Sequence, residues 1–287
     1  MRINSIFLLV VLSGLVGGCA SVATISEATE SSGAMQSSEA AQGNVGKADQ
    51  ADEGDKSKSL VSLAEDIEAH GKHDDAIKLY QQSVVLSGDA PDANVRLGDA
   101  CLRADRITLA IKAYRAALIK DPNNNDALLG LGTALVQDDS LDEGLADLAK
   151  AAPRVNTGTA YNRLGFAQTQ VGQFAKAQNT FKKGRAIAPD DLDIATNLAL
   201  AAALDNKADD AAVLVHEIVQ SPAAEERHRR NLVIALGLIG RSPDEARAAA
   251  PPEMPQHEIT ALLKRAKAIR GISDPKARAK ALGRMKR

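Results

Sequence analysis

The sequence predicts an all-α fold, built as a stack of helical hairpins. A leucine recurs through most of the chain at intervals of 34, 34, 33, 34 and 34 residues. These leucines are Leu63, Leu97, Leu131, Leu164, Leu198 and Leu232. Tryptophan is absent and aromatic residues make up 2% of the chain, so alanine and leucine must fill a core of thin, closely packed helical layers. A period of this length is typical of repeat architectures, in which each unit buries its apolar face against its neighbours.

The residues that follow each leucine explain the predicted hairpin. The clearest copy combines Leu97-Gly98, Ala110-x₃-Tyr114 and Pro122, and residues 161–189 repeat this arrangement. Small residues let the two helices approach closely, and the aromatic ring fills the gap between successive hairpins. Proline ends the second helix, because it cannot continue a helix interior.

This pattern resembles the tetratricopeptide repeat, over residues 59–250, with five clear copies and one degenerate copy. The resemblance implies a right-handed superhelix with a concave groove lined by the first helix of each hairpin. It implies that the following residues face the groove: Val95, Asp99, Leu102, Arg103, Leu129, Thr133, Gln137, Asn162, Phe166, Thr169, Gln170, Thr196, Asn197, Leu200 and Asn231. Phe166 is the large apolar group of this set; the alternative for it is partial burial against a neighbouring helix.

The N-terminus predicts export and lipid attachment. A short apolar run, Ile3 to Val16, is too short to span a bilayer and fits a signal peptide. It leads into Leu15-Val16-Gly17-Gly18-Cys19, which resembles a bacterial lipobox; the alternative is an ordinary signal peptide with a chance cysteine. We expect residues 1–18 to be removed and Cys19 to carry acyl chains that anchor the protein. In Gram-negative lipoproteins, a residue other than Asp after this cysteine implies the periplasmic face of the outer membrane.

Two further segments flank the repeats. Residues 19–58 are rich in Ser, Ala, Gly, Glu and Asp without a sustained helical stripe, which predicts a lipidated, disordered and flexible tether. Residues 251–287 predict a capping helix, Gln256 to Arg270, and a basic tail. Ten basic residues and one acid fall in residues 264–287, although the whole chain has a net charge of −2. This tail is either a solvated helix face or a docking element for an acidic partner or an anionic envelope polymer.

No residue pattern in the sequence predicts catalysis, so we expect a binding scaffold and not an enzyme. His70 and His73, followed by two aspartates, could hold a metal, but polar residues are expected at the turn where they lie. Cys101 fits core packing better than a reactive thiol. We therefore expect protein partners and a membrane anchor, with no cofactor, metal, nucleic acid or small-molecule substrate.

Residues 230–247 carry a second resemblance. They read R-N-L-V-I-A-L-G-L-I-G-R and then, two residues on, D-E-A-R, which is similar to the C-terminal part of TadD-type lipoproteins of the tight-adherence (Flp) pilus system. This resemblance implies an outer-membrane scaffold that binds the secretin or other pilus-assembly components, as a secretin pilotin or assembly factor. Two alternatives stay open: a generic envelope-assembly adaptor, and a regulatory subunit of an envelope (cell-wall) enzyme.

Overall fold

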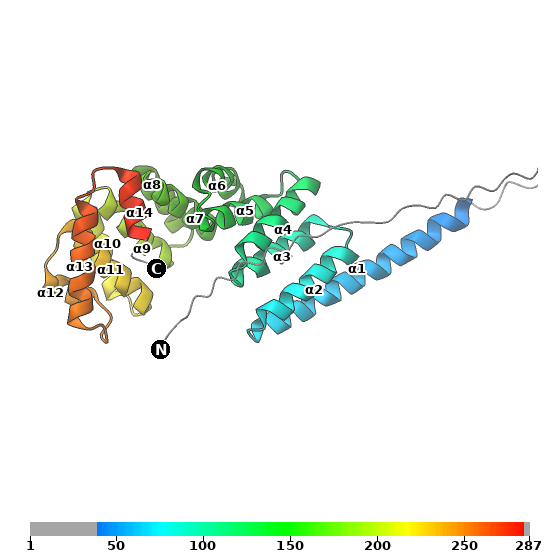
Figure 1. Ribbon diagram of the computed structural model, residues 1–287, viewed down its shortest axis with the longest axis horizontal. Helices are drawn as coiled ribbons and strands as arrows, with labels where there is room; N and C mark the ends of the chain where they lie inside the picture. Colours follow the sequence, from blue (N-terminus) through cyan, green and yellow to red (C-terminus); the bar gives the residue numbers. More distant parts are fainter. Residues whose placement is uncertain (1–38, 284–287) are drawn as a thin grey trace, which may run out of the picture. The chain divides into compact units, whose positions relative to one another are not determined.

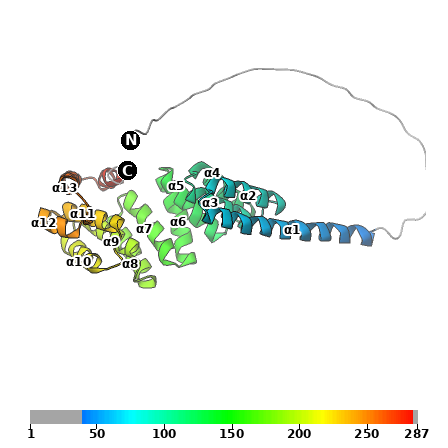
Figure 2. The ribbon, with the colours of Figure 1, turned by 90° about the horizontal axis from the view of Figure 1, so that it is seen from below.

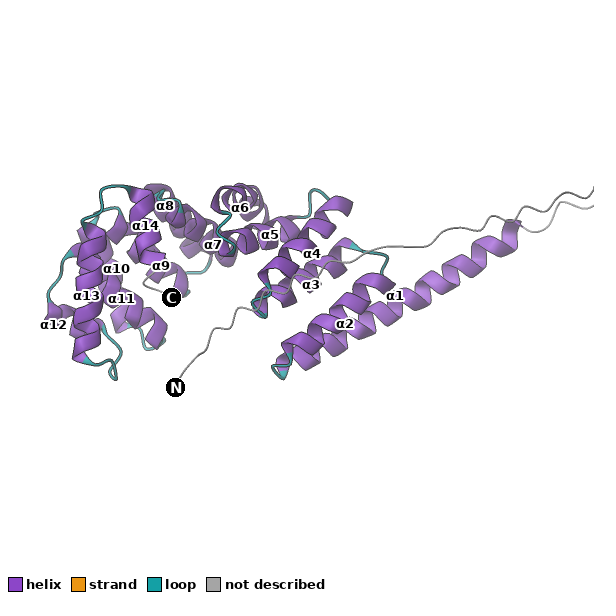
Figure 3. Ribbon diagram, in the orientation of Figure 1, coloured by secondary structure: helices purple, strands orange, loops and turns teal. Residues whose placement is uncertain are grey.

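The computed structural model describes the backbone of residues 39–283, and this part of the chain is helical throughout, with short turns between helices (Figures 1 and 3). By their contacts, the described residues from Lys47 onward form one compact unit. Fourteen helices lie in the described residues: α1 (Glu39–Ala69), α2 (His73–Leu86), α3 (Pro91–Arg103), α4 (Ile107–Lys120), α5 (Asn125–Gln137), α6 (Leu141–Val155), α7 (Gly158–Gln170), α8 (Phe174–Ile187), α9 (Leu192–Leu204), α10 (Ala208–Gln220), α11 (Glu226–Ile239), α12 (Pro243–Ala249), α13 (Gln256–Arg270) and α14 (Pro275–Gly283).

Successive helices pair into hairpins that follow one another in chain order (Figure 2). Each periodic leucine lies in the first helix of a hairpin, from Leu63 in α1 to Leu232 in α11. The predicted all-α stack of tetratricopeptide-type hairpins is confirmed. A first helix also contacts the first helix of the next hairpin, as α9 contacts α11, so the core continues from one repeat to the next.

Glycines set the distance between adjacent helices, both within a hairpin and between successive hairpins. The ring of Tyr114 lies so close to Gly98 and Gly130 that a Cβ at either position would fall 2.6 or 2.3 Å from it. Phe181 lies over Gly165 in the same way, at 2.6 Å. Both aromatic side chains are buried, so they fill the gaps that these small residues leave.

The expected tether boundary at residue 58 is wrong. Residues 39–58 belong to α1, whereas the first half of the expected tether and the signal peptide lie outside the described residues. The buried Ser57 hydroxyl donates a hydrogen bond of 3.1 Å to the Ser83 carbonyl oxygen of α2. A polar contact therefore joins this part of α1 to α2. A helix that packs through such a contact does not show a stripe of apolar residues in its sequence. Within the described residues, no helix is long and apolar enough to cross a membrane.

The C-terminal segment turns back over the repeats. The expected capping helix is α13, which buries Ile259, Leu262 and Ala266 and packs on α11. The basic tail then continues as α14, which contacts α7 and α9 of the same chain. Of its cations, Arg278 is buried, while Lys276 and Lys280 are exposed.

Candidate functional site: a groove in two sections

First helices of consecutive hairpins line a groove. Its first section, which we call the open section, receives side chains from α3, α5 and α7 and from the turn before α5. The lining residues are Asp92, Val95, Arg96, Asp99, Leu102, Arg103, Asn124, Asp126, Leu129 and Arg163. Five of the predicted groove residues therefore come together here, and they combine apolar and charged side chains on one surface.

Ion pairs hold the arginines at one edge of the open section. Arg103 of α3 donates two hydrogen bonds to the Glu68 carboxylate of α1, Nε to Oε1 at 2.6 Å and Nη2 to Oε2 at 2.7 Å. These hydrogen bonds and the positive charge lower the pKa of Glu68 below its ordinary value. Arg96 donates to Glu65 at 2.9 Å. Both arginines thus face the groove with their charges already balanced.

A tyrosine of the second helix fixes an aspartate of the first. The Tyr114 hydroxyl of α4 donates a hydrogen bond of 2.6 Å to Oδ1 of Asp99 on α3. Burial of the ring and the neighbouring Asp99 carboxylate raise the pKa of Tyr114, so this hydroxyl stays protonated and remains a donor. The Asp99 carboxylate is therefore held in one orientation in the open section.

Three other charged residues also line the open section. Asp92 and Asp126 are exposed, and Arg163 is half-buried on α7. Within the described part of the chain, none of these three forms an ion pair. Together with the apolar Val95, Leu102 and Leu129, the section could hold a protein segment that offers apolar side chains and charges of either sign.

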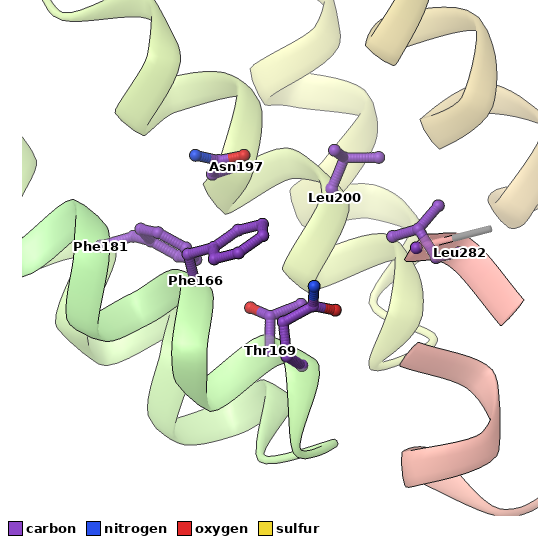
Figure 4. Close-up of a pocket in the computed structure, with 8 residues that line it drawn as sticks. Phe166, Thr169, Phe181, Asn197, Leu200 and Leu282 are labelled. Atoms are coloured by element: carbon purple, nitrogen blue, oxygen red, sulfur yellow. The ribbon is translucent and has the colours of Figure 1, made fainter. Parts of the chain in front are cut away.

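The second section of the groove, which we call the α14 subsite, is already filled. Phe166, Thr169 and Gln170 of α7 and Asn197 and Leu200 of α9 line it, as the sequence predicted for the groove. The C-terminal helix adds Leu282 and Gly283 to the same lining, and Phe181 lies behind Phe166 (Figure 4). Leu200 is 2% exposed, whereas Phe166 is 36% exposed and is one of the large apolar side chains that remain exposed while lining the subsite.

Several predicted groove residues have structural contacts of their own. Asn197 Nδ2 donates to Asn162 Oδ1 at 2.9 Å, which links α9 to α7. Thr133 donates at 2.7 Å to the Leu129 carbonyl oxygen of its own helix. Thr196 is wrong as a groove residue, because its side chain is buried between helices at 2% exposure. Besides Thr196, four predicted groove residues line neither section: Thr133, Gln137, Asn162 and Asn231. Cys19 lies outside the described residues.

The positional rule missed two parts of the groove. Asp92, Arg96, Asn124, Asp126 and Arg163 line the open section but are absent from the set of groove residues that the resemblance implied. Their polar character at the start or on the inner side of the first helices is the signal that could have identified them. The contribution of α14 had no local signal, because a helix from the far end of the chain supplies it.

Metal binding was considered for His70 and His73, and thiol chemistry for Cys101; the structure shows what each of these side chains contacts. His70 Nδ1 lies 2.7 Å from the Asp66 carbonyl oxygen, and His73 Nδ1 lies 3.8 Å from Glu68 Oε1. Among the described residues, no group of three or more His, Cys, Asp or Glu side chains could hold a metal ion. Cys101 is fully buried, and desolvation raises the pKa of its thiol to about 11.

Comparison with known proteins supports the repeat fold described above. Residues 60–165 match the protein family described as the middle TPR-like domain of cilia and flagella-associated protein 70. The chain has a tetratricopeptide-repeat fold. Two solved structures share it: one titled as the functional characterization of Pseudomonas aeruginosa pilF, and a tetratricopeptide repeat protein from Parabacteroides merdae.

These structural matches show the tetratricopeptide fold and no more. The P. aeruginosa structure has a TM-score of 0.57 at 17% identity, over 80% of this chain and 99% of that one. The P. merdae structure has a TM-score of 0.59 at 14% identity, over 80% of this chain and 93% of that one.

Two curated sequences match somewhat less than half of this chain. A putative cellulose synthase operon protein C of Escherichia coli O157:H7 is 28% identical over 128 residues, which is 44% of this chain. Cellulose synthase operon protein C of Pseudomonas fluorescens is 28% identical over 130 residues, which is 45% of this chain. The matched regions span 11% and 10% of these longer relatives.

Proposed function

We propose that this protein is a lipid-anchored scaffold at the periplasmic face of the outer membrane. It binds protein partners in Flp (tight-adherence) pilus assembly, as a secretin pilotin or an assembly factor. The observation that carries the proposal is the open section, where three consecutive first helices place charged and apolar side chains on one surface. Such a surface recognises a protein segment through several contacts at once.

The fixed side-chain positions in the open section favour specific recognition over non-specific binding. Asp99 is fixed by Tyr114, and Arg103 is fixed by Glu68. A partner that binds there meets charges in defined positions and does not have to order them, which lowers the cost of binding. Arg163, Asp92 and Asp126 are left to interact with the partner's own charges.

The pilus assignment rests on the TadD-like segment at residues 230–247, which forms α11 and α12 with the turn between them. Gly240 ends α11 in the left-handed conformation at φ 79°, where glycine is favoured. Ser242 and Glu245 form a capping box that begins α12, with both bonds present. The similar residues thus specify a helix junction in this chain.

Lipid attachment is tested by Cys19→Ser. Because the thiol is the proposed attachment point, the variant should appear in the soluble periplasmic fraction instead of the outer-membrane fraction. Secretin multimers should then fall and secretin subunits should spread to the inner membrane, as measured on fractionated cells. Normal secretin multimers at the outer membrane in this variant would exclude the pilotin role.

The groove is tested separately by Arg163→Glu. This change reverses a half-buried charge of the open section and should weaken secretin co-purification about tenfold or more. Lys112→Glu is the matched control, because Lys112 is exposed on α4 and does not line the open section. Equal co-purification with both variants would exclude the open section as the binding surface.

The generic envelope adaptor remains the second candidate. The similarity of 44% of the chain to cellulose synthase operon protein C favours it, since that relative is named for a cellulose synthase operon. Affinity purification of the anchored protein distinguishes the two. A polysaccharide synthesis or export component without any pilus component would favour the adaptor.

A further inference from the structure

The C-terminal helix occupies the groove in place of a partner. In Figure 4 the side chains of Phe166 and Asn197 lie on one side of the α14 subsite, and Leu282 reaches it from α14 on the other side, close to Leu200. Leu282 is 5% exposed, and Ala279, one turn earlier on α14, is 1% exposed. One apolar edge of α14 therefore makes the contact that a bound helix would make.

Arg278 provides the polar part of this contact. Its buried guanidinium donates to the Leu204 carbonyl oxygen at the end of α9, and at 2.9 and 2.7 Å to the Ile272 carbonyl oxygen. The end of a helix has unpaired carbonyl groups and a partial negative charge, which favour a cation there. Within the described residues, the hydrogen-bond acceptors of Arg278 are neutral carbonyl groups, so its full charge is buried without a carboxylate partner there.

The turn between α7 and α8 is shaped to receive α14. Gly172 in this turn has φ 79°, and a Cβ at this residue would lie 2.7 Å from backbone atoms of Pro275 and Lys276. No side chain fits between the turn and the first residues of α14. The backbone of the repeats is thus matched to a docked helix at this place.

The docking of α14 is nevertheless weakly secured. The helix has nine residues, and a helix this short is marginal in water unless packing supports it. A cavity of about 20 Å³ remains among Phe166, Leu200 and Leu282, so the apolar contact is incomplete. The outer face of α14 carries exposed Lys276 and Lys280, which form no ion pair within the described residues.

We propose that α14 is an exchangeable occupant of the groove. The α14 subsite accepts a short basic helix of a protein partner that presents an arginine and, four residues later, a leucine or a larger apolar residue. In the free protein Arg278 and Leu282 of α14 occupy these two positions and block the subsite, and the partner helix displaces them. This inference rests on the proposed partner-binding role of the groove and specifies the chemistry of one ligand.

The test uses the full chain with Cys19→Ser, so that no acyl chain is attached, and a fluorescent peptide of residues 273–287 as the ligand. Leu282→Asp in the protein places a charge in the apolar subsite and should release α14. The peptide should then bind this variant at least tenfold more tightly than it binds the parent chain, as measured by fluorescence anisotropy. The same peptide with Leu282→Asp should not bind.

Ala277→Asp is the matched control, because Ala277 is exposed on the same helix and its replacement leaves the docked edge intact. It should bind the peptide as weakly as the parent chain does. If Leu282→Asp loses helical content, Arg278→Gln serves as a second releasing variant with the same expected gain. Equal peptide binding to all variants, or none to a folded releasing variant, would overturn the proposal.

Hydrogen exchange of the parent chain gives an independent result. The amides of α14 should exchange at least tenfold faster than those of α9, because α14 undocks while the repeats stay folded. Equal protection of the two helices would show a fixed structural element. Neither the peptide-binding experiment nor hydrogen exchange involves the secretin. Their failure would therefore not affect the Cys19→Ser and Arg163→Glu tests of the proposed function, and failure of those tests would not affect these two experiments.

Discussion

Arg103 on α3 and Glu68 on α1 are joined by two parallel hydrogen bonds of 2.6 and 2.7 Å, across the boundary between the first two hairpins. The pair has the two-pronged geometry that makes arginine a specific partner of carboxylates. It contributes both to the stability of the hairpin stack and to the fixed charge pattern of the open section.

This pair predicts a dependence of stability on pH. The pKa of Glu68 is lowered in the folded protein, chiefly by its hydrogen bonds to Arg103, so its contribution is present above its ordinary pKa of 4.5. The contribution is lost as the pH falls through the lowered folded value. Glu68→Gln should cost about 1 kcal/mol at pH 7, because Arg103 is half-exposed and water screens the pair. Urea unfolding at pH 7, 5 and 3 should show this cost shrink below pH 4.5; a cost independent of pH would contradict it.

A second prediction concerns Tyr114→Phe. The change keeps the ring that fills the space beside Gly98 but removes the hydroxyl that donates to Asp99 at 2.6 Å. Hydrogen bonds to charged groups contribute about 1.5–3 kcal/mol, so unfolding in urea should show a loss near the lower end of this range. The matched control is Tyr80→Phe, since the Tyr80 hydroxyl lies 3.4 Å from Glu68 and should matter less. Equal losses would mean that the 2.6 Å hydrogen bond to Asp99 contributes no more than the 3.4 Å contact of Tyr80 with Glu68.

The hairpins could be predicted from the sequence because residues close together in the chain determine the structure of each repeat. The leucine period, the small residues beside Tyr114 and Phe181, and the helix over Gln256–Arg270 are all properties of neighbouring residues. The resemblance to the tetratricopeptide repeat also implied groove positions for Val95, Asp99 and Arg103, and all three line the open section. Local pattern is therefore sufficient for the architecture of a repeat protein.

Contacts between distant segments could not be predicted in this way. The Arg278 hydrogen bond to Leu204 joins residues 74 positions apart, and nothing in the composition of the basic tail indicates that one of its cations is buried. Residues 39–58 of α1 were missed for a related reason: the link to α2 near the end of this stretch is a serine pair, Ser57 with Ser83, instead of an apolar stripe. The role of the α14 subsite follows from tertiary packing alone.

A third prediction concerns the reactivity of Cys101. Its thiol is fully buried and its pKa is raised to about 11 by desolvation, whereas the thiolate is the reactive form. In a Cys19→Ser chain, Cys101 is the remaining one of two cysteines. At pH 8 it should react with an aromatic disulfide reagent at least a hundredfold more slowly in the folded protein than in urea. Comparable rates in the two states would show that the core around α3 and α4 opens readily.

A fourth prediction concerns the closest approach of α5 and α6, at Gly132. A Cβ at this position would lie 2.8 Å from the Gly144 carbonyl oxygen and 3.0 Å from the Leu148 amide nitrogen, and neither backbone atom can move aside without shifting α6. Gly132→Ala should therefore destabilise the protein by about 1–3 kcal/mol, although alanine favours a helix by about 1 kcal/mol over glycine. Gly54→Ala isolates the second effect, because a Cβ at Gly54 in α1 meets nothing within 4 Å and should leave stability unchanged or raised. If Gly132→Ala, like Gly54→Ala, left the stability in urea unchanged or raised, α5 and α6 would separate at little cost. The small residues of the repeat would then not set the helix spacing.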